Sequence, residues 1–227
     1  MTTRLDGIGA CVFDAYGTLF DVHSAAARCR HDLGDKADRL SDLWRQKQLE
    51  YSWLRSLMGA HVDFWQITGD ALDYAMAALD VEDPVLRAAL MELYLSIPAY
   101  PEVPDVLTAL KAREIKTGVL SNGAPIMLTS AVNCAKLSPM LDVVFSVEDV
   151  GVFKPDGRVY QMAVDRLKLA PEEIAFFSSN AWDVAGAASF GFRAVWCNRV
   201  GAPRERLPGK PVAEISNLSE ALPLLEA

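Results

Sequence analysis

The stretch that decides the fold reads CVFDAYGTLF and occupies positions 11–20. An apolar run over residues 8–13 predicts a short buried strand, and the carboxylate of Asp14 follows it at once. The chain then turns at Gly17 and places a hydroxyl at Thr18. In open α/β sheets, buried parallel strands present reactive groups at their carboxyl edge. We therefore interpret Asp14 as a nucleophile, against the alternative that it is an ordinary turn-forming aspartate.

Composition limits the classes of protein that this chain can belong to. With 227 residues, 51% of them apolar and 23% charged, it has the size and composition of one globular domain or of a core with an insertion. A net charge of −8 without a basic run argues against a nucleic-acid partner. No apolar run approaches the ~18 residues of a membrane span, and no secretory signal is expected at the start. Four widely spaced cysteines predict free thiols and a cytoplasmic location.

Residues 21–97 show helical periodicity and no strand pattern. Helices are predicted there over three segments: from an N-cap at Ser41 to a stop at Gly59, over 64–79, and from Asp83 and Pro84 to Ile97. A helical block inside an α/β pattern is typical of an inserted subdomain. We expect a helical cap at 21–98 and an α/β core formed by 1–20 and 99–227.

Strand and helix alternate after the helical block, which predicts a doubly wound, mostly parallel sheet. Further strands are predicted over 116–120, 143–147, 174–177, 193–197 and 212–215. Polar residues follow several of these strands, namely Ser121, Asn122, Lys154, Ser178, Ser179, Asn180 and Asp183. Because the carboxyl ends of parallel strands share one edge, these residues are candidates for a single site with Asp14.

Each of these residues also has an ordinary structural explanation. Ser121 and Asn122 are typical of a turn before a helix, Lys154 of a solvated loop, and Asp183 of a helix N-terminus. Their joint occurrence, each after an apolar strand, favours the common site.

In this order, Asp14-x-x-x-Thr18, Ser121, Lys154-Pro155 and Asp183 resemble the four-motif signature of the haloacid dehalogenase superfamily, over nearly the whole chain. Two further stretches, WRQKQLEYSWL at 44–54 and SSNAWD at 178–183, resemble the L-2-haloacid dehalogenases within it. The resemblance implies a Rossmann-like core with an inserted cap, no cofactor, and hydrolysis of short L-2-haloalkanoic acids. The products would be D-2-hydroxy acids and halide ion, formed through an ester on Asp14.

The resemblance also implies which side chains take part. Catalytic roles fall to Asp14, Thr18, Arg45, Ser121, Lys154, Tyr160, Ser178, Asn180 and Asp183. Binding of the 2-haloacid and of the halide falls to Tyr16, Arg45, Leu49, Phe64, Ser121, Asn122 and Trp182. No metal ligand is expected. Without the resemblance, Arg45 would be interpreted as a solvated helix residue and Phe64 as cap–core packing. A homodimer is implied as well, for which Trp44, Trp53 and Trp65 would offer apolar surface.

A magnesium-dependent phosphatase on the same fold is the nearest alternative. Phosphatases of the superfamily carry a second aspartate as general acid where this chain has Tyr16, and a phenol is the weaker proton donor near neutral pH. Ser179 or Asn180 replaces an expected metal-binding acid, although Asp14 and Asp183 still supply two carboxylates. A departing halide needs no proton, so these substitutions favour dehalogenation. A catalytically inactive binding protein is the alternative from another class.

Overall fold

The computed structural model describes residues 4–22 and 33–225, and its centre is a six-stranded sheet in which every strand pair is parallel. The spatial order is β3-β2-β1-β4-β5-β6. The strands are β1 (Ala10–Phe13), β2 (Lys116–Ser121), β3 (Val143–Ser146), β4 (Ile174–Ser178), β5 (Arg193–Cys197) and β6 (Ala213–Ile215). The predicted doubly wound α/β fold is confirmed, and the sheet is parallel throughout.

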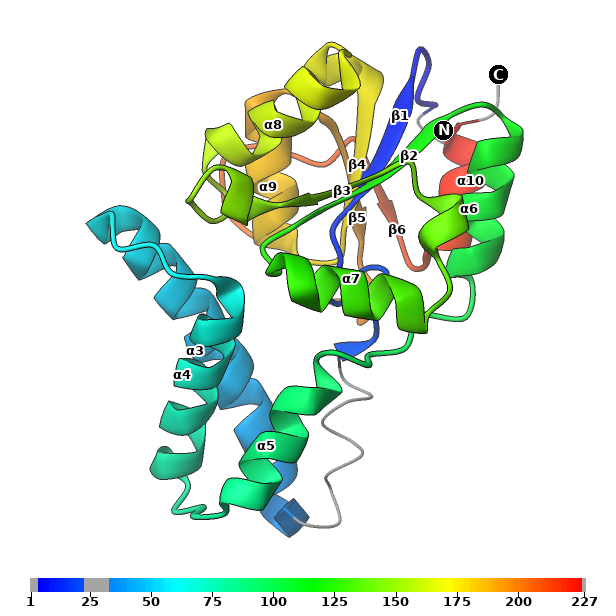
Figure 1. The fold of residues 1–227 in the computed structure, drawn as a ribbon. Coiled ribbons are helices and arrows are strands. Elements are labelled where there is room, and N and C mark those ends of the chain that lie inside the picture. The colour runs from blue at the N-terminus through cyan, green and yellow to red at the C-terminus, as the bar shows by residue number, and fades with distance from the viewer. Residues whose placement is uncertain (1–3, 23–32, 226–227) are drawn as a thin grey trace.

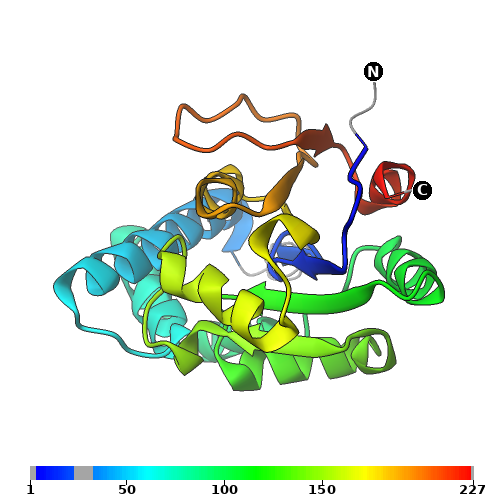
Figure 2. The ribbon, with the colours of Figure 1, turned by 90° about the horizontal axis from the view of Figure 1, so that it is seen from above.

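Helices cover both faces of this sheet (Figures 1 and 2). The core helices are α6 (Val103–Ala112), α7 (Pro125–Cys134), α8 (Gly157–Leu167), α9 (Ala181–Phe190) and α10 (Ala221–Leu224). In Figure 1, α6 and α10 lie on one side of the sheet, and α8 and α9 lie on the other. β1 and β4 are buried along their whole length, as expected for strands covered on both faces.

The strand order reverses between β1 and β4, and this places the site. The chain runs from β1 through β2 to β3 on one side, then returns to β4 on the other side of β1. Phe13 pairs with Phe177 and stacks on it at 5.1 Å between ring centroids. Asp14 and Ser178 therefore leave the two central strands side by side, at the point where α/β sheets bind their ligands.

Three helices from the segment 21–98 gather below and to one side of the sheet in Figure 1. They are α3 (Ala37–Met58), α4 (Phe64–Ala78) and α5 (Pro84–Leu93). Asp83 caps α5 as expected, and Gly59 ends α3 in a left-handed conformation. We propose that 21–98 is the cap, and that 1–20 and 99–227 are the core.

The predicted start of the first cap helix at Ser41 is wrong. α3 begins at Ala37, directly after a short 3-10 turn over Gly34–Lys36. The side chains of Ala37 and Leu40 are buried, so the apolar face of the helix reaches one turn further back than Ser41. Burial of that turn outweighs the capping preference of serine.

The cap tryptophans are buried or half-buried within this chain. Trp44 is 5% exposed and lies 4.9 Å from the ring of Tyr94, and Trp53 packs edge-on against Trp182. Apolar side chains that are exposed in the same segment include Leu57 and Met58 at the end of α3, and Val85 on α5. Among residues 4–22 and 33–225, no helix has the length and apolar character needed to cross a membrane.

Candidate active site

Asp14 is fixed by the backbone on both sides of its turn. Its N–H donates to the carbonyl of Phe177 at 2.9 Å, which continues the pairing of β1 with β4. Gly17 follows with φ +87°, a conformation that other residues rarely adopt. The turn brings the hydroxyl of Thr18 to 3.3 Å from Asp14 Oδ2, where that hydroxyl also accepts a hydrogen bond from the N–H of Ser179 at 2.8 Å.

Lys154 lies between two carboxylates in the buried centre of the site. Its Nζ donates to Asp14 Oδ1 at 3.2 Å and to Asp183 Oδ2 at 2.7 Å, and the lysine is 1% exposed. The hydroxyl of Tyr160 donates to Asp183 Oδ1 at 2.8 Å. Burial disfavours the charged lysine, but the two carboxylates outweigh it and raise the pKa of Lys154. Burial also raises the pKa of Asp183 to about 6, against the lowering effect of Lys154.

Two side chains from the end of β4 face the other oxygen of Asp14. Asn180 Nδ2 donates to Asp14 Oδ2 at 2.9 Å, and the Ser178 hydroxyl lies 3.5 Å from the same atom. Asn180 Oδ1 accepts from Arg45 Nη2 at 3.3 Å, which fixes the orientation of the amide. Asp14 Oδ2 therefore faces three donors, from Thr18, Ser178 and Asn180, whereas Oδ1 faces Lys154.

A small cavity of about 10 Å³ lies between these core residues and the cap. That volume holds about one water molecule. Ten side chains line it: Asp14, Tyr16, Arg45, Leu49, Phe64, Ser121, Asn122, Lys154, Asn180 and Trp182. The structure thus places all seven side chains that the sequence assigned to substrate and halide around one space. Thr18, Ser178 and Asp183 lie behind them, in contact with Asp14 or Lys154, and Tyr160 contacts Asp183.

Ser121 and Asn122 reach the cavity from the end of β2. The Ser121 hydroxyl accepts from the N–H of Gly123 at 3.0 Å, so its proton is free to point elsewhere. Asn122 Oδ1 accepts from the N–H of Lys154 at 3.0 Å. This leaves the NH₂ group of Asn122 as the end of the amide that an anion can use.

Tyr16 and Phe64 close the cavity with apolar surface. Tyr16 is 4% exposed, and burial raises the pKa of its phenol further above the ordinary range. Its hydroxyl has no hydrogen-bond partner among the described residues. Phe64 packs on Phe153, 5.9 Å between ring centroids, so it serves cap–core packing and lines the cavity at once.

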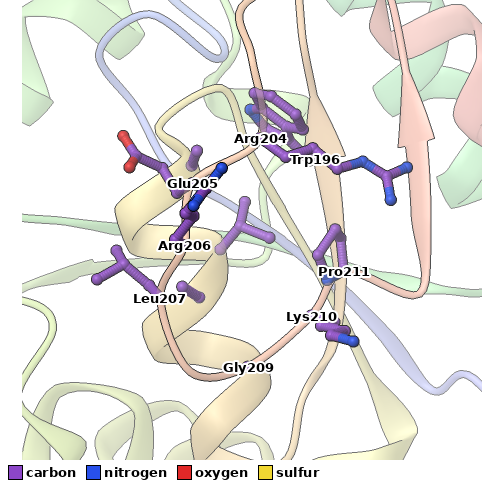
Figure 3. Close-up of a pocket in the computed structure, with 11 residues that line it drawn as sticks. Trp196, Arg204, Glu205, Arg206, Leu207, Gly209, Lys210 and Pro211 are labelled. Atoms are coloured by element: carbon purple, nitrogen blue, oxygen red, sulfur yellow. The ribbon is translucent and has the colours of Figure 1, made fainter.

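Several larger pockets lie outside the cavity, and two of them are neighbours that share Ala181 and Trp196. One of these two, of about 360 Å³, adjoins the cavity and shares Tyr16, Arg45, Leu49, Asn180 and Trp182 with it. The other, of about 300 Å³, lies between α9 and the loop that joins β5 to β6 (Figure 3). Its lining includes Trp196, Arg204 and Leu207 but none of the acids described above.

Sequence reasoning missed two polar residues that connect the cap to the site. Gln48 accepts a hydrogen bond from Arg45 Nη1 at 2.7 Å through its Oε1. Glu148 accepts from the N–H of Phe64 at 3.3 Å and lies 2.9 Å from His61 Nε2. A signal existed for Gln48, because it follows Trp44 by four residues and therefore shares the buried face of its helix. Glu148 had no local signal.

Comparison with known proteins fits this geometry. The family model of the haloacid dehalogenase-like hydrolases matches residues 8–191. The chain belongs to the haloacid dehalogenase-like hydrolases. Within this family it is 47% identical over 222 residues to (S)-2-haloacid dehalogenase 1 of Pseudomonas sp. strain CBS-3, which covers 97% of this chain and 98% of the relative. It is 46% identical to (S)-2-haloacid dehalogenase 4A of Burkholderia cepacia, with 97% and 96% of the two chains covered.

Solved structures of this hydrolase family include close matches to the fold. A crystal structure of a dehalogenase superposes with a TM-score of 0.96 at 46% identity, covering 98% of this chain and 99% of the other. The L-2-haloacid dehalogenase of Xanthobacter autotrophicus, solved with chloropropionic acid covalently bound, superposes with a TM-score of 0.89 at 36% identity, covering 96% and 98%.

Proposed function

We propose that this protein is an (S)-2-haloacid dehalogenase, a hydrolase that cleaves the carbon–halogen bond of short L-2-haloalkanoic acids. The observation that carries the proposal is the environment of Asp14, which meets a buried cation on one oxygen and three hydrogen-bond donors on the other. A carboxylate held in this way is fixed in direction and can act as a covalent nucleophile. The relatives that carry this activity in their names cover nearly the whole chain.

In the first step, one oxygen of Asp14 attacks the carbon that bears the halogen. Among the described residues, Oδ1 accepts a bond from Lys154 alone and keeps a lone pair for the attack. The carbon–halogen bond breaks as the carbon–oxygen bond forms, and halide leaves with both bonding electrons. Because the attack comes from the side opposite the halogen, an L substrate is inverted and gives an ester of the D configuration.

In the second step, water attacks the Asp14 carbonyl carbon and breaks the ester. Negative charge then develops on Oδ2, which Thr18, Ser178 and Asn180 are placed to stabilise. We assign Asp183 the proton that the attacking water loses, and the departing alkoxide takes that proton up. The products are a D-2-hydroxy acid and, once the second proton of the water has passed to solvent, the regenerated Asp14 carboxylate.

Arg45 and Asn122 are our candidates for binding the departing halide, because both present N–H donors at the cavity. The indole of Trp182 adds a polarisable wall. Ser121, at the end of β2, can donate to the substrate carboxylate. Tyr16, Leu49 and Phe64 supply the apolar lining that excludes bulk water and sets the room for the substrate chain.

The residues of the site do not fit a magnesium ion. Each carboxylate oxygen of Asp14 and Asp183 already accepts a hydrogen bond, from Lys154, Asn180 or Tyr160. Asn180 Nδ2 also lies 3.4 Å from the carbonyl oxygen of Tyr16. A cation that needs oxygen ligands would meet N–H groups there. The raised pKa of Tyr16 further weakens it as an acid for a phosphate leaving group, so we place the phosphatase alternative second.

Halide release tests the proposed function directly. We expect chloride from L-2-chloropropionate in the presence of a chelator, and much less from the D isomer. A phosphatase activity that magnesium strongly stimulates, without halide release, would overturn the proposal.

The ester route has its own test. During repeated turnover in ¹⁸O water, hydrolysis through the Asp14 carbonyl carbon transfers label to Asp14, which mass spectrometry of its peptide detects. An active but unlabelled enzyme would show direct attack of water on the substrate.

We also propose that the enzyme is a cytosolic homodimer that acts on small molecules. Leu57 is 84% and Met58 is 68% exposed at the end of α3, which offers apolar surface for a second subunit. Sedimentation of the purified protein distinguishes the dimer from a monomer.

A further inference from the structure

Gln48 is a fully buried amide in the interior of the cap. It lies on α3, is 0% exposed, and faces the side of α4 that carries Thr68, which is also 0% exposed. Trp44, one helical turn earlier, donates its indole N–H to the Thr68 carbonyl at 2.8 Å. A buried glutamine costs stability unless its amide is hydrogen-bonded, so its partners indicate why it is tolerated.

The hydrogen bonds of Gln48 have a fixed direction. The Thr68 hydroxyl donates its one proton to the carbonyl of Phe64 at 2.6 Å, so it can only accept from Gln48 Nε2, 2.8 Å away. With its NH₂ group thus committed, Gln48 presents Oε1 to Arg45 Nη1 at 2.7 Å. Burial raises the pKa of the Tyr94 phenol, and a hydrogen bond with the Gln48 side chain opposes that rise, in keeping with the same amide orientation.

We propose that Thr68 and Gln48 are positioning residues that hold the Arg45 guanidinium against the halide site. The inference rests on the proposed function, because it assigns a purpose to the charge of Arg45. Arg45 is held at one terminal nitrogen by Gln48 from the cap and at the other by Asn180 from the core. Both partners are neutral amides, so the guanidinium is oriented while its positive charge stays available to an anion.

A matched set of threonine variants tests this chain of hydrogen bonds. Thr68→Val keeps the shape of the side chain but removes the hydroxyl, so the Gln48 amide is free to turn its NH₂ group toward Arg45. Thr68→Ser keeps the hydroxyl. Thr108 provides the control, because its hydroxyl bonds the carbonyl four residues earlier in α6 at 2.7 Å, as Thr68 does in α4, but far from the site.

We expect Thr68→Val to lower kcat for L-2-chloropropionate about tenfold, the order of effect of a lost charge-assisted hydrogen bond. The loss should be smaller for L-2-bromopropionate, because bromide is the better leaving group and depends less on Arg45. KM should change little. The kcat of Thr68→Ser should stay within about threefold of that of the wild type, and the kcat of Thr108→Val should equal that of the wild type.

The outcomes separate the inference from simpler explanations. A folded Thr68→Val with wild-type kcat, or an equal loss on the chloro and bromo substrates, would overturn the positioning role. Gln48→Glu covers the case in which Thr68→Val fails to fold, because it keeps the shape but neutralises Arg45. It should lose chloride release at least as severely, and full retention would refute the inference. If the wild type releases no halide from either substrate, the proposed function itself fails.

Discussion

Lys154 and Arg45 are the two cations that meet at the site, and they are held in opposite ways. Lys154, from the core, is 1% exposed and bonded to the carboxylates of Asp14 and Asp183. Arg45, from the cap, is partly exposed, and its described partners are the neutral amide oxygens of Gln48 and Asn180. The first cation is compensated by protein charge. The second keeps its charge for an anion that comes and goes.

This difference separates two tasks. A nucleophile must stay ionised in a buried place, which requires a permanent counter-charge next to it. A leaving halide is present for only part of the cycle, so its partner must be oriented without being neutralised. We expect substitution of Lys154 to affect chemistry and folding together, and substitution of Arg45 to affect chemistry with little change in folding.

The largest effect should come from Asp14. Asp14→Asn removes the nucleophile and should lower kcat by about four orders of magnitude or more. Lys154 keeps Asp183 as its partner, so the variant should fold. Chloride release and circular dichroism measure the two quantities. Activity near the wild type would refute the role assigned to Asp14.

Lys154→Met should remove activity and also destabilise the core. It leaves two buried carboxylates without their cation, a loss of about 3–5 kcal/mol in the free energy of unfolding. Adding Asp183→Asn removes one uncompensated charge, so the double variant should regain stability but not activity. Urea denaturation of the single and double variants measures this. Equal stabilities for the two would show that charge burial is not the cause.

Arg45→Ala should lower kcat for L-2-chloropropionate about a hundredfold and leave the free energy of unfolding within about 1 kcal/mol of the wild type. The reason is that Arg45 is partly exposed and pairs with no described carboxylate. A melting temperature that falls as far as that of Lys154→Met would contradict the contrast between core and cap.

The pH profile of kcat should show a single decline, on the acid side. Burial raises the pKa of Asp183 to about 6. Below that pH the carboxyl holds a proton and cannot accept one from water in the second step, so kcat should fall as the pH drops through about 6. On the alkaline side the two carboxylates raise the pKa of Lys154 despite its burial, so the lysine stays charged beyond its usual range. Measuring kcat against pH for the wild type and for the weakly active Asp183→Asn tests this. The acid-side decline should be present in the wild type and absent from the variant.

The smallest effect should come from the second contact between cap and core. Glu148 accepts from the N–H of Phe64 and lies 2.9 Å from His61. Glu148→Gln keeps the shape and removes the charge, and we expect a fewfold increase in KM with kcat nearly unchanged. Steady-state kinetics measures both. A large fall in kcat would show that Glu148 supports the chemical step at Lys154 rather than the contact between cap and core.

The core half of the site could be predicted from the sequence because parallel strands deliver their next residues to one edge. Asp14, Ser121 and Ser178 each follow an apolar run, and the order of the runs was sufficient to bring them together. The geometry between them was not predictable, since the two bonds of Lys154 depend on how far β1 and α9 stand apart.

The cap half depended on the resemblance. Arg45 and Phe64 lie on helices whose periodicity indicates a buried face but not what that face covers. Two polar contacts show what these faces cover, one between Arg45 and Asn180 and one between Phe64 and Glu148. Both contacts join residues more than eighty positions apart in the sequence. The start of α3 was misplaced for a related reason, because burial against distant residues extended the helix beyond its local signal.

The cavity of about 10 Å³ has a consequence for the timing of the catalytic cycle. A 2-haloacid occupies far more than the space of one water, so under the proposed function the side chains that line the cavity must move apart when the substrate enters. The adjoining pocket of about 360 Å³ shares Arg45 and Asn180 with the cavity. Their 3.3 Å contact therefore lies at the boundary between the pocket and the cavity. If substrate entry separates Arg45 from Asn180, we expect it also to loosen the proposed halide site, so that halide departs as bulk water enters.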